Sequence, residues 1–192
     1  MILFITQKSY FFTIKYFLNS FKKNSEIIYI EEKKRGLIKK YKEIFFYFGP
    51  IDFFKLCFLE LLCIILYHKN EQKLKTFSIK DCDVNKFVNE KLIEKNYSKI
   101  ISVGCPCKLE AELSKKYSID IYNLHGGILP YQKGRFSPIK SLKKNHKYIG
   151  ATLHKISNEI DCGEIVSQDF VLNKNYSPLI AYKEVLKISS NL

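Results

Sequence analysis

Two hydrogen-bonding side chains stand directly before a pair of glycines in this chain. Asn123 and His125 are followed by Gly126 and Gly127 in the stretch NLHGGILPYQKG, residues 123–134. An amide stays a donor at any working pH, and an imidazole can donate or accept a proton near neutrality. The stretch therefore has the groups to hold a ligand oxygen and move a proton. Taken alone, it is equally compatible with two polar side chains that cap a turn.

A carboxylate follows in the polar loop SNEIDCGEI, residues 157–165, where Asp161 precedes Gly163 by two positions. Its alternative role is to cap the turn before that glycine. A metal site built from asparagine, histidine and aspartate is disfavoured, because neither a second histidine nor a close carboxylate completes the shell. We expect His154 to have a structural or supporting role, and no functional hypothesis rests on His68 or His146.

The elements that position these groups follow from hydrophobic periodicity. Apolar runs predict strands over 1–7, 25–32, 73–79, 98–104, 119–125, 151–156 and 165–172. Helical spacing falls between them, over 8–22, 85–96 and 108–116, and a helical insertion occupies about 33–75. Strands that alternate with helices predict an α/β fold with a Rossmann-like, doubly wound and mostly parallel sheet. We treat residues 1–192 as a single domain.

This architecture puts Asn123 and His125 at the carboxyl ends of the parallel strands, where ligands bind. Residues two apart on a strand point to one face, so Asn123 and His125 lie together. Gly126 and Gly127 end the strand in torsions closed to other residues. The carboxyl ends of the strands are where a doubly wound sheet binds its ligand.

Charge and cysteine usage narrow the class of protein. The formal net charge is +13, but the lysines are scattered, with short runs over 31–40 and 140–147, and no nucleic-acid-binding motif is visible. A solvated basic surface or a phosphate-bearing substrate is favoured over nucleic acid. Six cysteines without a CxxC pair predict free thiols in a cytoplasmic protein.

One segment is long and apolar enough to be compared with a membrane-spanning helix. Residues 44–67 are strongly apolar, but Gly49 and Pro50 interrupt them, and three charged residues follow, Asp52, Lys55 and Glu60. A spanning helix needs about 20 mainly apolar residues. We predict no spanning segment, but a turn followed by an apolar amphipathic helix that packs on the domain, at a homodimer face or on a membrane surface. The N-terminus lacks the features of a signal peptide.

The ordered series of motifs between residues 100 and 172 resembles the catalytic domain of the folate-dependent formyltransferases. The series is Asn-x-His, then Leu-Pro with Lys-Gly, then Gly-x-Thr-x-His, then Ile-Asp-x-Gly. The resemblance implies transfer of a formyl group from 10-formyltetrahydrofolate to a primary amine, without a metal. It also implies a catalytic trio of Asn123, His125 and Asp161. In those roles the amide holds the oxyanion, the imidazole donates or moves protons, and the carboxylate orients the imidazole and accepts a proton.

The resemblance further implies where folate binds. In this family the pterin lies against the loop after the strand that matches 98–104 and against the loop that carries the aspartate, held largely by main-chain groups. The matching positions here are Cys105, Cys107, Lys108, Leu109 and Ile160.

Departures from the family pattern bear on the acceptor, a small-molecule amine that we expect to be phosphorylated. The segment after the first strand has no glycine to cradle a phosphate, and the chain ends at Leu192 without room for the barrel domain of the methionyl-tRNA enzymes. We therefore expect the amino group of a nucleotide-linked sugar, with Lys8, Lys133 and Arg135 as phosphate partners. Three alternatives stay open: an enzyme like the glycinamide ribonucleotide or methionyl-tRNA formyltransferases, a formyltetrahydrofolate hydrolase, and a non-catalytic binding member.

Overall fold

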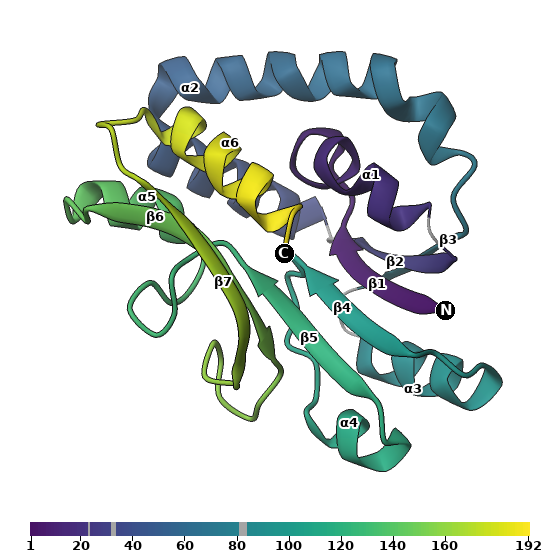
Figure 1. Ribbon diagram of the computed structural model, residues 1–192. Helices are drawn as coiled ribbons and strands as arrows, with labels where there is room; N and C mark the ends of the chain where they lie inside the picture. The colour runs from purple at the N-terminus through teal and green to yellow at the C-terminus, as the bar shows by residue number, and fades with distance from the viewer. Residues whose placement is uncertain (23, 32–33, 81–83) are drawn as a thin grey trace.

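A computed structural model describes every residue except 23, 32–33 and 81–83, and within it seven strands form one sheet (Figure 1). Five strands run parallel in the order β3-β2-β1-β4-β5, and two antiparallel strands, β6 and β7, extend the β5 edge. The bounds are β1 Ile2–Gln7, β2 Ser25–Glu31, β3 Thr76–Lys80, β4 Lys99–Val103, β5 Asp120–His125, β6 Tyr148–Lys155 and β7 Ile165–Leu172. The predicted α/β fold with a mostly parallel, Rossmann-like sheet is confirmed.

Helices cover both faces of this sheet (Figure 1). One face carries the π-helix η1 (Tyr10–Ile14) and the helices α1 (Lys15–Phe21), α2 (Lys34–Glu71), α5 (Ser137–Lys143) and α6 (Pro178–Ser189). The other face carries α3 (Val84–Glu94) and α4 (Glu112–Tyr117). In β1, Phe4 packs into the first layer, and Leu3 and Ile5 pack into the second. A strand buried on both faces is apolar throughout, as the opening residues of this chain are.

The helical insertion after β2 is present as α2, which bends in the middle. Gly49 has φ 74° and ψ 167°, a conformation that L side chains rarely adopt, and Pro50 opens the second half. The turn followed by an apolar helix is therefore confirmed. Residue 32, the expected end of the second strand, and residue 33, the expected start of the insertion, lie outside the described part. Among the described residues, no helix is long and apolar enough to cross a membrane.

The second half of α2 is attached to the fold through its acidic side chains. Asp52 accepts a hydrogen bond from the backbone N–H of Leu179 at 2.9 Å, in the first turn of α6. Glu60 accepts from the backbone N–H groups of Tyr10 (2.8 Å) and Phe11 (2.7 Å) in η1. Helix N-termini expose N–H groups that need acceptors, and a carboxylate there is favourable. Two of the three charged residues that interrupt the apolar segment thus cap neighbouring helices.

The helices α4, α5 and α6 differ from the sequence prediction. α4 begins at Glu112 and not at 108. Lys108 precedes it, and its Nζ donates to the carbonyl of Asn158 at 2.5 Å. α5 and α6 were not predicted, although Ser177 followed by Pro178 is a helix-start pattern. The prediction of free thiols is confirmed for the five described cysteines, and Cys82 lies outside the described residues.

Replacing Glu60 by alanine should destabilise the fold. The change leaves the N–H groups of Tyr10 and Phe11 and the hydroxyl of Ser9, which donates to Glu60 at 3.1 Å, without this acceptor. We expect a loss of about 1–3 kcal/mol in the free energy of unfolding, measured by urea denaturation. Glu90→Ala, at an exposed position of α3, is the control and should change stability by less than about 0.5 kcal/mol. Equal losses in both variants would show that the cap contributes nothing.

Candidate active site

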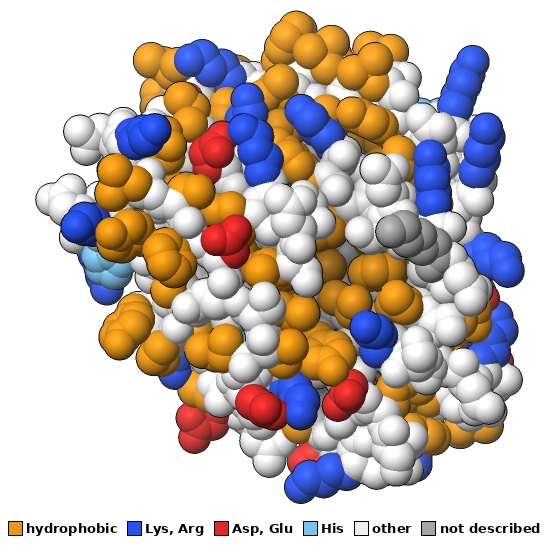
Figure 2. Space-filling view, viewed as in Figure 1, with side chains coloured by type: hydrophobic (Ala, Val, Ile, Leu, Met, Phe, Trp, Pro, Cys, Tyr) orange, Lys and Arg blue, Asp and Glu red, His pale blue; other side chains and the backbone are white. Residues whose placement is uncertain are grey.

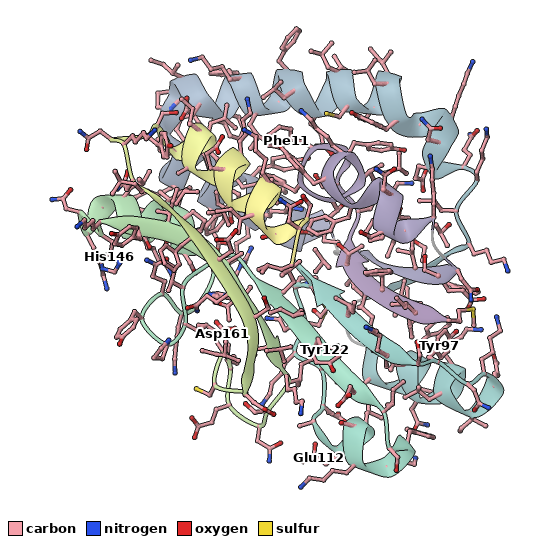
Figure 3. All side chains as sticks on the ribbon, viewed as in Figure 1. Phe11, Tyr97, Glu112, Tyr122, His146 and Asp161 are labelled. Atoms are coloured by element: carbon pink, nitrogen blue, oxygen red, sulfur yellow. The ribbon has the colours of Figure 1, made fainter. Side chains whose placement is uncertain are left out.

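A cavity of about 440 Å³ opens where β1, β4 and β5 end. Gln7, Ser102 and Asn123 line it from these three strands, and α5 and α6 supply part of the wall. Figure 3 shows Asp161 on the loop between β6 and β7, near the carboxyl end of β5. The cavity therefore lies beside the point where the strand order reverses, between β1 and β4, as in other doubly wound sheets.

The antiparallel register of β5 and β6 assembles the polar centre of the cavity. Asn123 pairs with His154, and His125 pairs with Thr152. Residues directly opposite in such a pair present their side chains to the same face. Asn123, His125 and His154 accordingly all line the cavity, which agrees with the expectation that Asn123 and His125 share a face.

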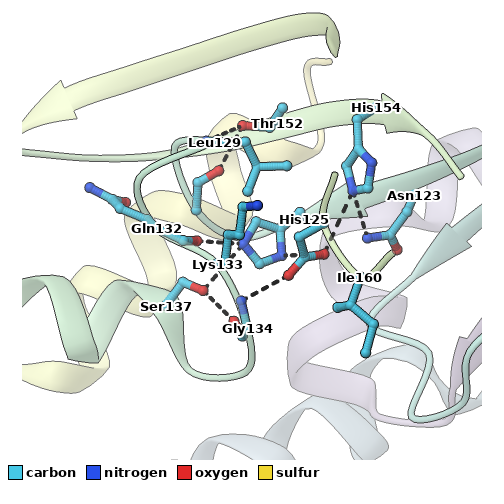
Figure 4. Close-up of polar contacts among 12 residues, drawn as sticks. Asn123, His125, Leu129, Gln132, Lys133, Gly134, Ser137, Thr152, His154 and Ile160 are labelled. Carbon is cyan, nitrogen blue, oxygen red and sulfur yellow. Dashed lines mark hydrogen bonds and ion pairs between the residues drawn. The ribbon is translucent and has the colours of Figure 1, made fainter. Parts of the chain in front are cut away.

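His154 determines how the amide of Asn123 is presented (Figure 4). Its Nδ1 lies 2.9 Å from the carbonyl oxygen of Lys155 and must donate to it. In the neutral ring the other nitrogen, Nε2, is then an acceptor. Asn123 Nδ2 lies 3.1 Å from this nitrogen and donates to it. The second N–H of the same amide is left for a ligand in the cavity.

His125 and Asp161 form the second half of the centre. His125 Nε2 donates to the carbonyl of Gln132 at 2.7 Å, and His125 Nδ1 lies 3.6 Å from Asp161 Oδ1. The other carboxylate oxygen of Asp161 accepts from the backbone N–H of Gly134 at 2.8 Å. Asp161 Oδ1 is also 3.8 Å from His154 Nε2. Both ring nitrogens of His125 thus face oxygen atoms, so the doubly protonated imidazole has an acceptor on each side.

Backbone conformation and close packing hold these groups in place. Asp161 has φ 54° and Phe136 has φ 56°, which is a rare conformation for a bulky residue. Such strain is typical of sites where the surroundings impose the geometry. A Cβ at Gly127 would meet the carbonyl oxygen of Gln132, and would lie 2.8 Å from His125 Nε2. Neither Gly126 nor Gly127 has a positive φ, so the expectation of torsions closed to other residues is wrong. The second glycine after His125 instead allows the loop to pack directly on the imidazole.

The residues predicted to contact folate all line the cavity. They are Cys105, Cys107, Lys108, Leu109 and Ile160. The two loops that carry them are joined by the Lys108 ammonium, which donates to the carbonyl of Asn158. A hydrogen bond with Cys107 and burial raise the pKa of the Cys105 thiol, so this side chain is neutral. The loops thus form one wall of the cavity.

The residues predicted to contact an acceptor phosphate do not all come together. Arg135 lines the cavity, whereas Lys8 and Lys133 do not. Lys8 pairs with Glu71 at 3.1 Å, because alternation on the extended segment turns it away from its neighbours Gln7 and Ser9. Lys133 donates to the sulfur of Cys162 at 2.8 Å.

Several residues that support the site escaped the sequence analysis. Thr152 Oγ1 donates to the carbonyl of Gly127 at 2.7 Å and accepts from the backbone N–H of Leu129 at 3.1 Å. Gln168 Nε2 donates to the same hydroxyl at 2.7 Å. Gln132 acts on His125 through its carbonyl, which no residue type reveals. Thr152 stands within the quoted Gly-x-Thr-x-His pattern, and only its contacts identify its role.

Comparison with known proteins agrees with this geometry. A sequence model of the family described as formyl transferase matches residues 70–175, which is more than half of the chain. The chain belongs to this family. Asn123, His125 and Asp161 all lie within the matched part of the chain. α2 lies almost wholly before it.

Curated relatives match parts of the chain. Formyltetrahydrofolate deformylase 2, mitochondrial, of Arabidopsis thaliana is 41% identical over 61 residues, 31% of this chain and 18% of the relative. dTDP-4-amino-4,6-dideoxyglucose formyltransferase of Mycobacterium bovis is 32% identical over 87 residues, 45% of this chain and 35% of the relative. Formyltetrahydrofolate deformylase of Haemophilus influenzae is 27% identical over 136 residues, 65% of this chain and 47% of the relative. The chain thus spans less than half the length of these relatives.

Solved structures share the fold. Phosphoribosylglycinamide formyltransferase from Anaplasma phagocytophilum superposes with a TM-score of 0.67 at 18% identity, over 100% of this chain and 82% of the other. A sugar N-formyltransferase from Shewanella sp FDAARGOS_354 superposes with a TM-score of 0.62 at 19% identity, over 100% of this chain and 65% of the other.

The buried imidazole of His154 should make stability depend on pH. Burial lowers the pKa of His154 in the folded protein, whereas in the unfolded chain a histidine titrates near about 6.5. The stability contributed by the neutral ring is therefore complete above this pH and is lost as the pH falls toward the lowered pKa. Between about pH 7.5 and about pH 5, we expect the free energy of unfolding to fall further in the wild type than in His154→Gln.

The control for this measurement is Asn96→Gln, which changes an exposed side chain that does not titrate. It should keep the pH dependence of the wild type. An identical pH dependence in the wild type and His154→Gln would contradict the assignment of a neutral, buried ring.

Proposed function

We propose that this formyl transferase moves the formyl group of 10-formyltetrahydrofolate to a primary amine. The observation that carries the proposal is the convergence of Asn123, His125 and Asp161 on one cavity, within the part of the chain that matches the family. Its volume of about 440 Å³ lies in the range of sites for small organic ligands. The loops at 104–109 and 157–161 supply backbone donors and acceptors for the polar edge of a pterin.

Asn123 stabilises the negative charge that develops on the formyl oxygen. One N–H of its amide is bonded to His154 Nε2 at 3.1 Å, and this bond orients the other N–H toward the cavity. A donor that is already oriented needs no rearrangement when the charge appears. His154 is thus a positioning residue that acts through Asn123.

His125 and Asp161 handle the proton. The amine loses a proton as its nitrogen bonds to the formyl carbon, and the folate nitrogen gains one as its bond to that carbon breaks. Asp161, held by Gly134, is the acceptor for the first proton. His125 Nδ1, 3.6 Å from that carboxylate, donates when the ring is protonated and otherwise accepts. Gln132 holds the opposite nitrogen, so the ring cannot turn away from Asp161.

A second recess, next to the cavity, supports a phosphorylated acceptor. It measures about 430 Å³ and shares Arg135 and Phe136 with the cavity. Most of the remainder is cationic or aromatic, and Tyr47 stacks on Phe136 with ring centroids 4.5 Å apart. The acidic lining residue, Glu43, pairs with Arg135 at 3.2 Å. The other lining residues are Lys39, Lys42, Glu43 and Phe46. Cations beside aromatic rings suit a phosphate joined to a planar base.

This combination favours an amino group on a nucleotide-linked sugar as the acceptor. The relative from Mycobacterium bovis is named for such a substrate. We place the sugar in the cavity and the phosphates and base in the recess, where cations from α2 replace a glycine-rich loop after β1. Arg135 keeps the role expected from the sequence, and Lys39 and Lys42 take the places expected for Lys8 and Lys133.

A second candidate function is hydrolysis of formyltetrahydrofolate. Two of the relatives described above are formyltetrahydrofolate deformylases. The same three side chains would serve with water as the nucleophile. The basic aromatic recess favours the transferase, because water needs no cationic subsite.

An acceptor screen tests the function. Purified protein is incubated with 10-formyltetrahydrofolate and one of several acceptors, and both tetrahydrofolate and formate are measured. The acceptors are amino-sugar nucleotides, glycinamide ribonucleotide and water alone. We expect amine-dependent release of tetrahydrofolate without formate, and a fall in kcat of about 10²–10³ in Asn123→Ala. Asn96→Ala, at an exposed position, should keep full activity.

Three other results of the acceptor screen would contradict the proposed function. Stoichiometric formate without amine would identify the hydrolase. Undiminished turnover in Asn123→Ala would place the chemistry elsewhere, and no turnover with any acceptor in the folded wild type would overturn the transferase.

A variant of the recess tests whether it binds the phosphate of the acceptor. Lys42→Ala should raise KM for a nucleotide-linked amine about 10- to 100-fold, since a hydrogen bond to a charged group contributes about 1.5–3 kcal/mol. KM for the formyl donor and kcat should stay within about threefold. Lys86→Ala, an exposed lysine of α3, is the control. An equal effect of Lys42→Ala on an amine without phosphate would refute the phosphate role.

A further inference from the structure

The outer face of α2 concentrates exposed hydrophobic side chains. Of the 21 large hydrophobic residues that are exposed in the described chain, 12 lie on this helix. In its second half, six of them are between 55% and 71% exposed: Ile51, Phe54, Phe58, Leu61, Ile65 and Leu66. Figure 2 shows hydrophobic side chains gathered along the upper edge of the molecule, where α2 lies in Figure 1. A patch of this kind on a soluble domain marks an interaction surface.

The inner face of the same segment is already buried. Leu56 and Cys63 belong to the hydrophobic core, and Asp52 and Glu60 are bonded to α6 and η1. The segment is therefore apolar on both sides. A helix that is apolar all round is covered on all sides, so the outer face requires an apolar environment of its own.

The charges beside this face have one sign. Among the described side chains of residues 51–71, Asp52 and Glu71 are buried and Glu60 is turned onto η1, so no carboxylate lies on the outer face. The ammonium groups of Lys55 and Lys69 are exposed there. His68 is exposed as well and lies 3.0 Å from the Tyr10 hydroxyl. The face is thus hydrophobic with cationic edges, and whatever covers it is apolar and negatively charged at its border.

We propose that the outer face of α2 docks the protein on the surface of a membrane that contains anionic lipid, with the helix lying flat and not crossing. The lysines reach the headgroups while the phenylalanine, leucine and isoleucine side chains enter the boundary of the acyl chains. This surface role is separate from the formyl-transfer reaction.

Two observations favour lipid over a second copy of the chain. Each copy carries a formal charge of +13, and a two-fold contact through α2 would bring lysines together without acidic partners on that face. The six exposed positions also span roughly 140° of the helix circumference at about 100° per residue, which is wider than the seam of a two-helix contact. A bilayer surface accommodates a wide arc and attracts the lysines.

Vesicle flotation with the full chain tests this proposal. One set of vesicles contains phosphatidylcholine alone, and the other contains phosphatidylcholine with phosphatidylglycerol. We expect the protein to float with the anionic vesicles, to bind at least about tenfold more weakly to the neutral ones, and to be released by high salt. The double variant Phe58→Glu with Ile65→Glu should lose this binding. Ile93→Glu, which alters an isolated and equally exposed residue of α3, should bind as the wild type does.

Each variant is first shown to be folded by its far-ultraviolet circular dichroism and its unfolding midpoint. Absence of flotation by the folded wild type would overturn the proposal, as would unchanged flotation of the double variant. A dimer detected by light scattering that dissociates in the double variant, without vesicle binding by the wild type, would assign the face to self-association and also overturn it. Lys55→Glu with Lys69→Glu should weaken anionic binding while the midpoint stays unchanged.

Discussion

The candidate site depends on the pairing register of β5 and β6. Antiparallel alignment places Asn123 opposite His154 and His125 opposite Thr152. Three of these side chains, those of Asn123, His125 and His154, line the cavity, and the buried Thr152 hydroxyl bonds the loop that follows His125. A slip of one residue would turn the β6 partners to the opposite face of the sheet. The hydrophobic residues that fix the register, such as Ile149 and Ala151, are fully buried against α6. Packing at one end of β6 therefore determines the chemistry at the other.

Hydrogen bonds to and from the loops fix the side chains that the strands bring together. Thr152 and Gln168 hold the backbone of 127–129, the carbonyl of Gln132 holds His125, and the N–H of Gly134 holds Asp161. Each of these hydrogen bonds is ordinary. Together they restrict the His125 ring to one orientation and hold the Asp161 carboxylate toward it. The left-handed conformations of Asp161 and Phe136 persist because these bonds outweigh the local preference for negative φ. The arrangement is preorganised, which is what stabilisation of a developing charge requires.

The sequence was sufficient for the sheet, for the insertion and for the shared face of Asn123 and His125, because periodicity and strand alternation act locally. The sequence was insufficient where the position of a side chain depends on a partner that is distant along the chain. Lys8 was expected near a phosphate, but the buried carboxylate of Glu71, distant in sequence, binds it instead. The role of Gln132 is exerted by its carbonyl, and the orientation of Asn123 follows from a bond between His154 and a neighbouring backbone oxygen. Such effects require coordinates.

The inward-turned acids of α2 make this helix part of the fold and not an appendage. Asp52 and Glu60 serve as acceptors for the first turns of two other helices, and the aromatic and aliphatic side chains between them complete the core. Excision of the whole segment to obtain a less adhesive protein would uncap α6 and η1 and open the interior to water. Resurfacing is the better engineering route: polar replacements confined to outward positions would leave the scaffold intact. Changes on the outside of this helix would therefore alter only what the surface binds, whereas changes on its inside would also destabilise the domain.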